Sequence, residues 1–279
     1  MSRSCFMPIV SPSPAKASSA PTQSVSLATL RAQVAVVREE RAPVLPFGIA
    51  SVDESLADRG LGSDGLHEIA AASPSLADDA AATLFVAGIA ARFAAGAGAQ
   101  VLWALTRFDL YAPGLEQAGL GPNRIFYAQG AKDAEVLAAA EDALRDGSLV
   151  CVVAEVRSAD MTMTRRLQLA ASDSRTPMLL YKRYRARGRC PLSQPSCAMT
   201  RWRIGCAPSQ PLAQAGLGHA GLAHAGLSSA HWNVELVRQR GGAPFFLELE
   251  ACDATGRLAM PAATRDRAVA PVRATSHAA

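Results

Sequence analysis

The chain has 279 residues, of which 49% are hydrophobic and 19% are charged. This content is enough to bury a sizeable core, which excludes a chain that is disordered throughout. No apolar run reaches the roughly 18 residues of a membrane-spanning helix, and residues 1–10 lack the pattern of a secretory signal. The six cysteines form no CxxC pair, so we expect reduced thiols in a cytoplasmic protein that does not bind membranes.

The composition changes along the chain. Residues 1–23 are rich in Ser, Pro and Ala, which predicts a disordered tail, and apolar residues at helical spacing over 24–41 predict a short amphipathic helix. Between about 44 and 260, short apolar strands alternate with helical segments, as is typical of an α/β domain with a mostly parallel sheet. The expected strands are Gly65–Ala70, Gln100–Leu105, Arg124–Ala128, Leu149–Val153, Met178–Tyr181, Arg201–Cys206, Trp232–Arg240 and Phe245–Glu250. The expected helices are Pro74–Ala95 with Ser73 as its N-cap, Pro113–Ala118, Lys132–Arg145 ended by Gly147, and Thr164–Ser172.

The last part of the chain departs from this alternation. Residues 215–227 repeat the pattern AGLxH, and their two histidines, His219 and His224, have no carboxylate or thiolate nearby. Two isolated imidazoles are weak evidence for a metal site, so we interpret the repeat as a low-complexity insert. Gly241-Gly242 predicts a hairpin between the last two strands, and residues 261–279 predict a second disordered tail.

The segment Phe47–Leu56 and the strand Gly65–Ile69 resemble the opening of the RecA-like ATPase core, in which this strand leads into a phosphate-binding loop. Here the strand is followed by Ala70–Asp79, which contains neither Gly nor Lys. A phosphate loop needs glycines, so that backbone N–H groups can surround the phosphates, and a lysine that neutralises their charge. We therefore expect a RecA-like α/β core with a degenerate phosphate loop, no cofactor and no ATPase activity.

Acidic residues near the expected loop also disfavour ATP. Asp78 and Asp79 fall in the first turn of the following helix, where they would repel a triphosphate. Glu155 comes just after the expected strand Leu149–Val153, displaced from the position of a Mg²⁺-binding aspartate, and no acidic residue directly follows Gln100–Leu105. We expect helix capping and solvent exposure to account for these carboxylates.

Three later motifs narrow the resemblance from RecA-like proteins in general to one family. TRWRI at Thr200–Ile204, WNVELVRQRGG at Trp232–Gly242 and CDATGRL at Cys252–Leu258 are together similar to the ImuA family. Members of this family are bacterial DNA-damage-inducible proteins related to RecA and, more distantly, to SulA. The resemblance runs from about Leu27 to Leu258, and its last two motifs are fairly specific.

This resemblance implies a role in DNA repair within the SOS response, namely SOS mutagenesis by translesion DNA synthesis. The implied partners are an ImuB-like protein and an error-prone DnaE-type polymerase. Because the phosphate loop is degenerate, we expect a non-catalytic accessory factor. Two alternatives stay open: a RecA- or KaiC-like ATPase with an unusual loop, which the missing lysine disfavours, and a SulA-like inhibitor of cell division, which the length of the chain and its basic stretch disfavour.

A basic stretch with two interleaved tyrosines lies at Tyr181–Arg189, where a RecA-like core would face DNA. Arginines can contact phosphates and tyrosines can stack on unpaired bases, so single-stranded DNA or the polymerase complex is a candidate ligand. The alternatives are a solvated charged surface and a strand with one basic face. The candidate contact residues, including two arginines beside the expected hairpin, are Lys182, Arg183, Arg185, Arg187, Arg189, Arg238 and Arg240.

Overall fold

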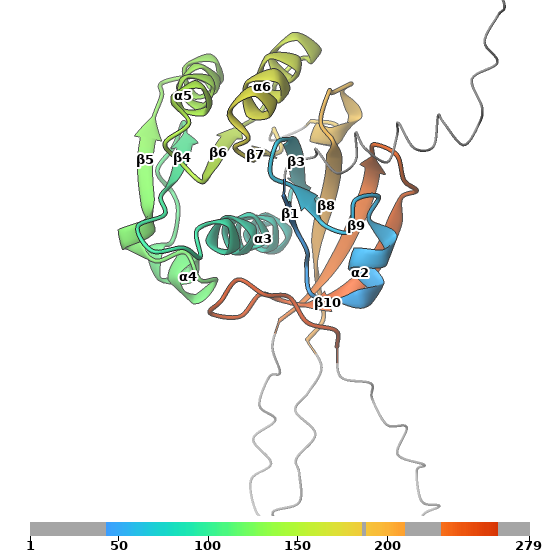
Figure 1. Ribbon diagram of the computed structural model, residues 1–279. Helices are drawn as coiled ribbons and strands as arrows, with labels where there is room; N and C mark the ends of the chain where they lie inside the picture. The colour runs from blue at the N-terminus through green and yellow to red at the C-terminus, as the bar shows by residue number, and fades with distance from the viewer. Residues whose placement is uncertain (1–42, 186–187, 210–229, 262–279) are drawn as a thin grey trace, which may run out of the picture. The chain divides into compact units, whose positions relative to one another are not determined.

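The computed structural model describes residues 43–185, 188–209 and 230–261 (Figure 1). Four segments predicted from the sequence lie outside these ranges, wholly or but for one residue: 1–23, 24–41, 215–227 and 261–279. Within the described residues, no helix is long and apolar enough to cross a membrane.

Eight strands form one sheet in the order β10-β9-β8-β3-β7-β6-β4-β5 (Figure 1). Six neighbouring strands run parallel: β3 (Leu66–Ala71), β4 (Val101–Leu105), β5 (Ile125–Gln129), β6 (Cys151–Val156), β7 (Met178–Lys182) and β8 (Thr200–Ala207). The other two, β9 (His231–Gln239) and β10 (Phe245–Glu250), pair antiparallel beyond β8. The predicted α/β class with a mostly parallel sheet is confirmed, and the arrangement is consistent with a RecA-like core.

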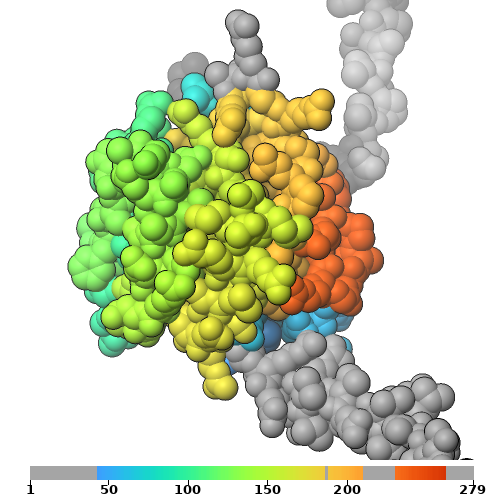
Figure 2. Space-filling view, turned by 90° about the horizontal axis from the view of Figure 1, so that it is seen from above, coloured from blue at the N-terminus to red at the C-terminus, as the bar shows by residue number. Residues whose placement is uncertain are grey.

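Helices cover both faces of the sheet. The longer helices are α3 (Leu76–Phe93), α5 (Asp133–Asp146) and α6 (Met161–Ser174), and the shorter ones are α2 (Ala50–Ser55), α4 (Ala112–Gln117), η1 (Pro122–Arg124) and η2 (Pro191–Ser193). Figure 1 shows α5 and α6 on one side of the sheet and α3 on the other. Each face has its own apolar core, with α3 in the first and α5 and α6 in the second. Seen from above, the green and yellow-green surfaces of α5 and α6 lie side by side (Figure 2).

The middle strands are buried on both faces. Every residue of β3, β6 and β7 is buried, as is usual for parallel strands that helices cover on both sides. Three charged residues nevertheless lie on these strands: Glu68, Glu155 and Lys182. A buried charge is costly unless a partner compensates it, so each of the three needs an explanation.

Several element boundaries differ from those predicted. Helix α3 begins at Leu76 and its N-cap is Ser75, whose side chain accepts a hydrogen bond from the N–H of Asp78. Ser73, which was predicted to be the cap, instead donates to the Asp78 carboxylate at 2.5 Å. Strand β6 extends to Val156, beyond the predicted end, and α6 begins three residues early because Asp160 caps it.

Two turns agree with the sequence. Gly147 ends α5 in the left-handed conformation, with φ of 70°, as a C-cap glycine does. Strands β9 and β10 form the predicted hairpin, in which Phe245 pairs with Leu236 and Glu250 with His231.

The first described segment forms a small unit that the sequence did not predict. Strands β1 (Val44–Leu45) and β2 (Leu61–Gly62) pair antiparallel. The carboxylate of Asp53, on α2, accepts hydrogen bonds from the N–H groups of Phe47 and Gly48 at 2.6 and 2.8 Å. The opening motif therefore folds a local turn.

Candidate functional site at the carboxyl ends of the central strands

The carboxyl ends of parallel strands form the edge at which α/β proteins usually bind ligands. Between β3 and α3, residues 72–75 stand where a RecA-like ATPase has its phosphate loop. Internal contacts hold this connection in place: Tyr184 donates its hydroxyl hydrogen to the carbonyl of Ala72 at 3.1 Å. On β8, the N–H of Cys206 donates to the carboxylate of Asp78 at 2.8 Å.

Arg183, the first residue after β7, is the centre of an ion-pair network at this edge. Its guanidinium lies 3.0 Å from the carboxylate of Glu155 on β6, 3.2 Å from that of Asp79 on α3 and 2.9 Å from that of Asp109 after β4. The side chain of Arg183 is only 20% exposed. A cation of the protein and three carboxylates thus occupy the edge, and we call them the Arg183 network.

Neighbouring aromatic residues hold the Arg183 network in position. Tyr181 donates its hydroxyl hydrogen to Asp79 at 2.6 Å, and the indole N–H of Trp103 points to Glu155 at 3.4 Å. Burial, followed by the charge of Asp79, raises the pKa of Tyr181 well above its ordinary range, which keeps its hydroxyl a donor at all physiological pH values.

The pKa values of Glu155 and Arg183 are both raised, for different reasons. Burial raises the pKa of Glu155 from 4.5 to about 7, against the opposing effect of Arg183. Burial alone would lower the pKa of Arg183, but Glu155 and Asp79 outweigh it and raise that pKa. The expectation that solvent exposure accounts for Glu155 was wrong, because β6 continues past it and leaves its side chain only 4% exposed.

We expect this burial to make stability depend on pH through Glu155. Because its pKa is higher in the folded chain, the folded state binds the proton more tightly, so stability falls as pH rises from about 4.5 to about 7. Relative to a Glu155→Gln variant, the unaltered chain should lose on the order of 3 kcal/mol between pH 5 and pH 8. Urea unfolding of both proteins across this range measures the difference, and a difference that stays constant would contradict the assignment.

Lys182 lies on the other face of β7 from the Arg183 network and is fully buried. Its ammonium is 2.8 Å from one oxygen of Glu68 on β3, while Arg201 on β8 is 2.7 Å from the other oxygen. Lys182 also donates to the carbonyl of Ala159 at 3.2 Å. A side chain placed in this way cannot reach a partner or DNA, so the prediction that Lys182 is a surface contact was wrong. Only Tyr181 and Lys182 of the basic stretch belong to strand β7, which ends at Lys182.

The other residues of the basic stretch separate in space. Arg183 belongs to the Arg183 network, whereas Arg185 and Arg189 are exposed. Arg187 lies outside the described residues.

Arg238 and Arg240, at the end of β9, are exposed as residues, but their guanidinium groups hold the chain before β8. Arg238 donates to the carbonyls of Ser196 and Ala198 at 3.0 and 2.7 Å, and Arg240 donates to that of Cys197 at 3.2 Å. Burial, followed by the charge of Arg201, lowers the pKa of Arg238. Both arginines therefore contact the chain before β8, and their role as partner contacts stays a prediction.

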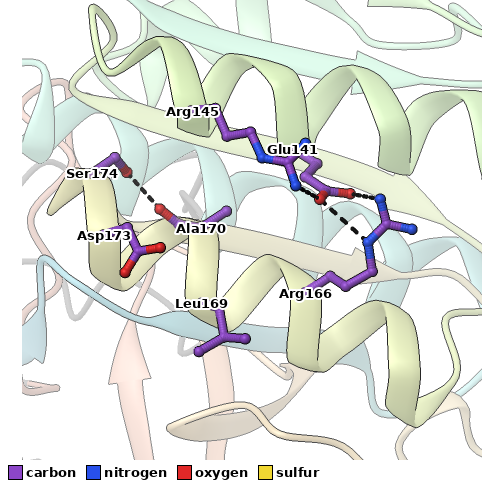
Figure 3. A pocket seen from close by; sticks show the side chains of 7 residues that line it. All are labelled: Glu141, Arg145, Arg166, Leu169, Ala170, Asp173 and Ser174. Atoms are coloured by element: carbon purple, nitrogen blue, oxygen red, sulfur yellow. Dashed lines mark hydrogen bonds and ion pairs between the residues drawn. The ribbon is translucent and has the colours of Figure 1, made fainter.

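The hollow between α5 and α6 has no free cation (Figure 3). It measures about 380 Å³, and Glu141 on its wall is buried between Arg145 and Arg166. Figure 3 shows both guanidinium groups turned toward this carboxylate. The cluster joins the two helices, and both arginines are engaged by it.

The CDATGRL motif forms a turn that packs on α3. Asp253 accepts hydrogen bonds from the N–H groups of Thr255 and Arg257 at 2.8 and 3.0 Å. Gly256 adopts φ of 74° and lies directly against the backbone of Gly88 on α3. This motif, like the buried Trp232 of the preceding one, has a structural role.

A comparison with known proteins shows the family of this chain. The chain is 36% identical over 217 residues to Protein ImuA of Caulobacter vibrioides, in strain NA1000 and in strain CB 15, covering 76% of this chain and 85% of that protein. The chain belongs to the ImuA family. No family model matches the sequence. In this ImuA family member, the Arg183 network lies at the same edge of the sheet as residues 72–75.

Sequence reasoning missed three residues that the fold brings to the central strands. Asp109 lies four residues beyond β4 and reaches Arg183, although no acidic residue directly follows that strand. Glu68 and Arg201 lie on strands that flank each other in the parallel sheet and pair with one another at 2.7 Å. The opposite charges of Glu68 and Arg201, each in an apolar strand, were the signal in the sequence that could have indicated this ion pair. Whether two such residues meet depends on the order of the strands in the sheet, which local sequence patterns do not give.

Proposed function

We propose that this ImuA family member is a non-catalytic accessory factor of damage-induced mutagenesis. It would act in translesion DNA synthesis, within the SOS response, together with an ImuB-like protein and an error-prone DnaE-type polymerase. Family membership supports the process. The observation that carries the non-catalytic role is the Arg183 network, which stands at the edge where a RecA-like ATPase would bind phosphates and Mg²⁺.

A contact function needs no energy from a bound nucleotide, whereas an ATP-driven conformational cycle does. A ligand shifts a conformational equilibrium only by its difference in affinity for the two states. ATP would need to displace Arg183 from three carboxylates, and those carboxylates would then face the triphosphate. We therefore infer that the protein binds its partners constitutively, through surfaces that the folded core holds ready.

Genetics in the organism of origin tests the proposed process. Deleting the gene should lower the frequency of ultraviolet-induced mutations to the level of a strain that lacks the ImuB-like protein, and deleting both genes should lower it no further. A deletion strain with normal induced mutagenesis would contradict the proposal.

Capture experiments test the constitutive mode and the alternative partner. The purified full chain should retain the ImuB-like protein equally with and without Mg-ATP, and it should not retain the cell-division GTPase that a SulA-like inhibitor would bind. Capture that requires ATP would favour the ATPase alternative, and capture of the GTPase alone would favour the inhibitor.

A further inference from the structure

A second, basic hollow lies at the same edge of the sheet, beside the Arg183 network. It measures about 930 Å³. Four cationic side chains on its wall come from four different connections: Arg107 after β4, Lys132 before α5, Arg157 after β6 and Arg185 after β7. All four residues are exposed. We call the hollow that these four side chains line the basic hollow.

The charge of the basic hollow is largely uncompensated. Among the described residues, none forms an ion pair with Arg157 or Arg185. Arg107 and Lys132 have carboxylates only at 4.0 and 3.8 Å. The one acidic residue on the wall, Asp133, accepts the backbone N–H groups of Arg157 and Ser158 at 3.1 and 3.0 Å. The basic hollow is thus suited to bind an anion.

The Arg183 network explains why nearby carboxylates do not neutralise the positive charge of the basic hollow. The carboxylate of Asp109, which could neutralise Arg107, lies 2.9 Å from Arg183 and 4.0 Å from Arg107. Arg183 also engages Asp79 and Glu155. Arg183 therefore engages the carboxylates nearest to the basic hollow, and the exposed cations remain available.

The spread of the cations favours a polymer over a single phosphate. They follow four neighbouring strands, β5, β4, β6 and β7, and three strand spacings amount to about 14 Å. An exposed aromatic pair adjoins them: Phe108 directly follows Arg107, is 56% exposed, and packs edge-to-face on Tyr127 with ring centroids 4.7 Å apart. Phosphate-binding cations beside exposed rings are the combination that proteins use to bind single strands.

We propose that the basic hollow binds the phosphate backbone of single-stranded DNA, with a base stacked on the Phe108–Tyr127 pair. The choice of DNA rests on the proposed function. Lys182, Arg238 and Arg240 have no part in this site. Of the basic stretch, Tyr184 and Arg185 line it, and the three other cations come from connections outside that stretch.

Fluorescence anisotropy with a labelled oligothymidylate tests the site on the full chain. Changing Arg107, Lys132, Arg157 and Arg185 together to Ala should weaken binding. It should also make the plot of log affinity against log salt less steep by about 3, because each single-strand phosphate contact contributes roughly 0.7 to the steepness. The matched control is Arg165→Ala, an exposed arginine on α6 outside the basic hollow, which should leave the slope unchanged. Circular dichroism checks that each variant is folded.

A separate variant tests the stacking of a base on the Phe108–Tyr127 pair. Phe108→Ala should weaken oligothymidylate binding about tenfold without changing the salt slope, since a stacked base contributes affinity but no released counterions. An unchanged affinity of Phe108→Ala would overturn the stacking. A quadruple variant with the slope of the unaltered chain would overturn the site, as would full competition by thymidine monophosphate at equal phosphate concentration.

Failure of this inference can be told apart from failure of the proposed function. If the chain does not bind the oligonucleotide but gene deletion lowers induced mutagenesis, the site is wrong and the proposed function stands. If the chain binds through the basic hollow but deletion leaves induced mutagenesis normal, the site is confirmed and the proposed function is wrong.

Discussion

Replacing Glu68 with Gln should lower the free energy of unfolding by about 3–5 kcal/mol. Glu68 is fully buried and compensates two cations, Lys182 at 2.8 Å and Arg201 at 2.7 Å, which are themselves almost fully buried. The amide keeps the shape of the side chain but removes its negative charge. Two positive charges would then stay in the sheet with only carbonyl partners, those of Ala159 and Gln194.

Urea unfolding measures this loss, and the chain offers a matched control. Glu235 on β9 pairs with Arg203 on β8 at 2.6 Å, but the two side chains are 31% and 38% exposed. Glu235→Gln should therefore cost less than about 1 kcal/mol. Adding Lys182→Met to Glu68→Gln should restore part of the loss, because one of the two uncompensated charges is removed. Equal losses for Glu68→Gln and Glu235→Gln would contradict the buried triad.

Gly256→Ala should destabilise the fold by about 2–5 kcal/mol. The residue has φ of 74°, which costs a non-glycine residue about 1–2 kcal/mol. An added Cβ would also collide with the carbonyl oxygen of Gly88 on α3, and overpacking of this kind costs about 1–3 kcal/mol. The Gly88 carbonyl is backbone and cannot rotate away, as a side chain could.

Gly98 provides the control that separates the two terms. Its φ is 72°, and no described atom lies within 4 Å of a Cβ built there. Gly98→Ala should therefore show the backbone cost alone, about 1–2 kcal/mol. Thermal or urea unfolding of both variants gives the comparison. If Gly256→Ala were no more destabilising than Gly98→Ala, the close packing of the CDATGRL turn on α3 would be contradicted.

Periodicity and composition were enough to predict the parallel sheet and its helices. The strands were recognisable because the buried ones are continuous apolar runs, as in Leu149–Val153, and Gly147 marked a helix end. A predicted helix boundary was wrong where either of two nearby residues could act as the N-cap, as Ser73 and Ser75 could at the start of α3.

The site was harder to predict because its partners lie far apart in the sequence. A stretch that alternates basic and aromatic residues looks the same on a surface and in a buried strand, so nothing local distinguished Lys182 from Arg185. What separates them is Glu68, more than 100 positions away, which strand β3 brings beside β7. Likewise, only the strand order brings Arg183 beside Asp79 and Asp109.

The proposed contact function requires that the Arg183 network stand in place of a nucleotide site. Isothermal titration of the purified full chain with Mg-ATP near pH 7.5 tests it. We expect no saturable heat, because Ala70–Asp79 offers no glycine or lysine and Arg183 is held by three carboxylates. A saturable isotherm with a micromolar dissociation constant that Arg183→Ala or Asp79→Ala alters would contradict it.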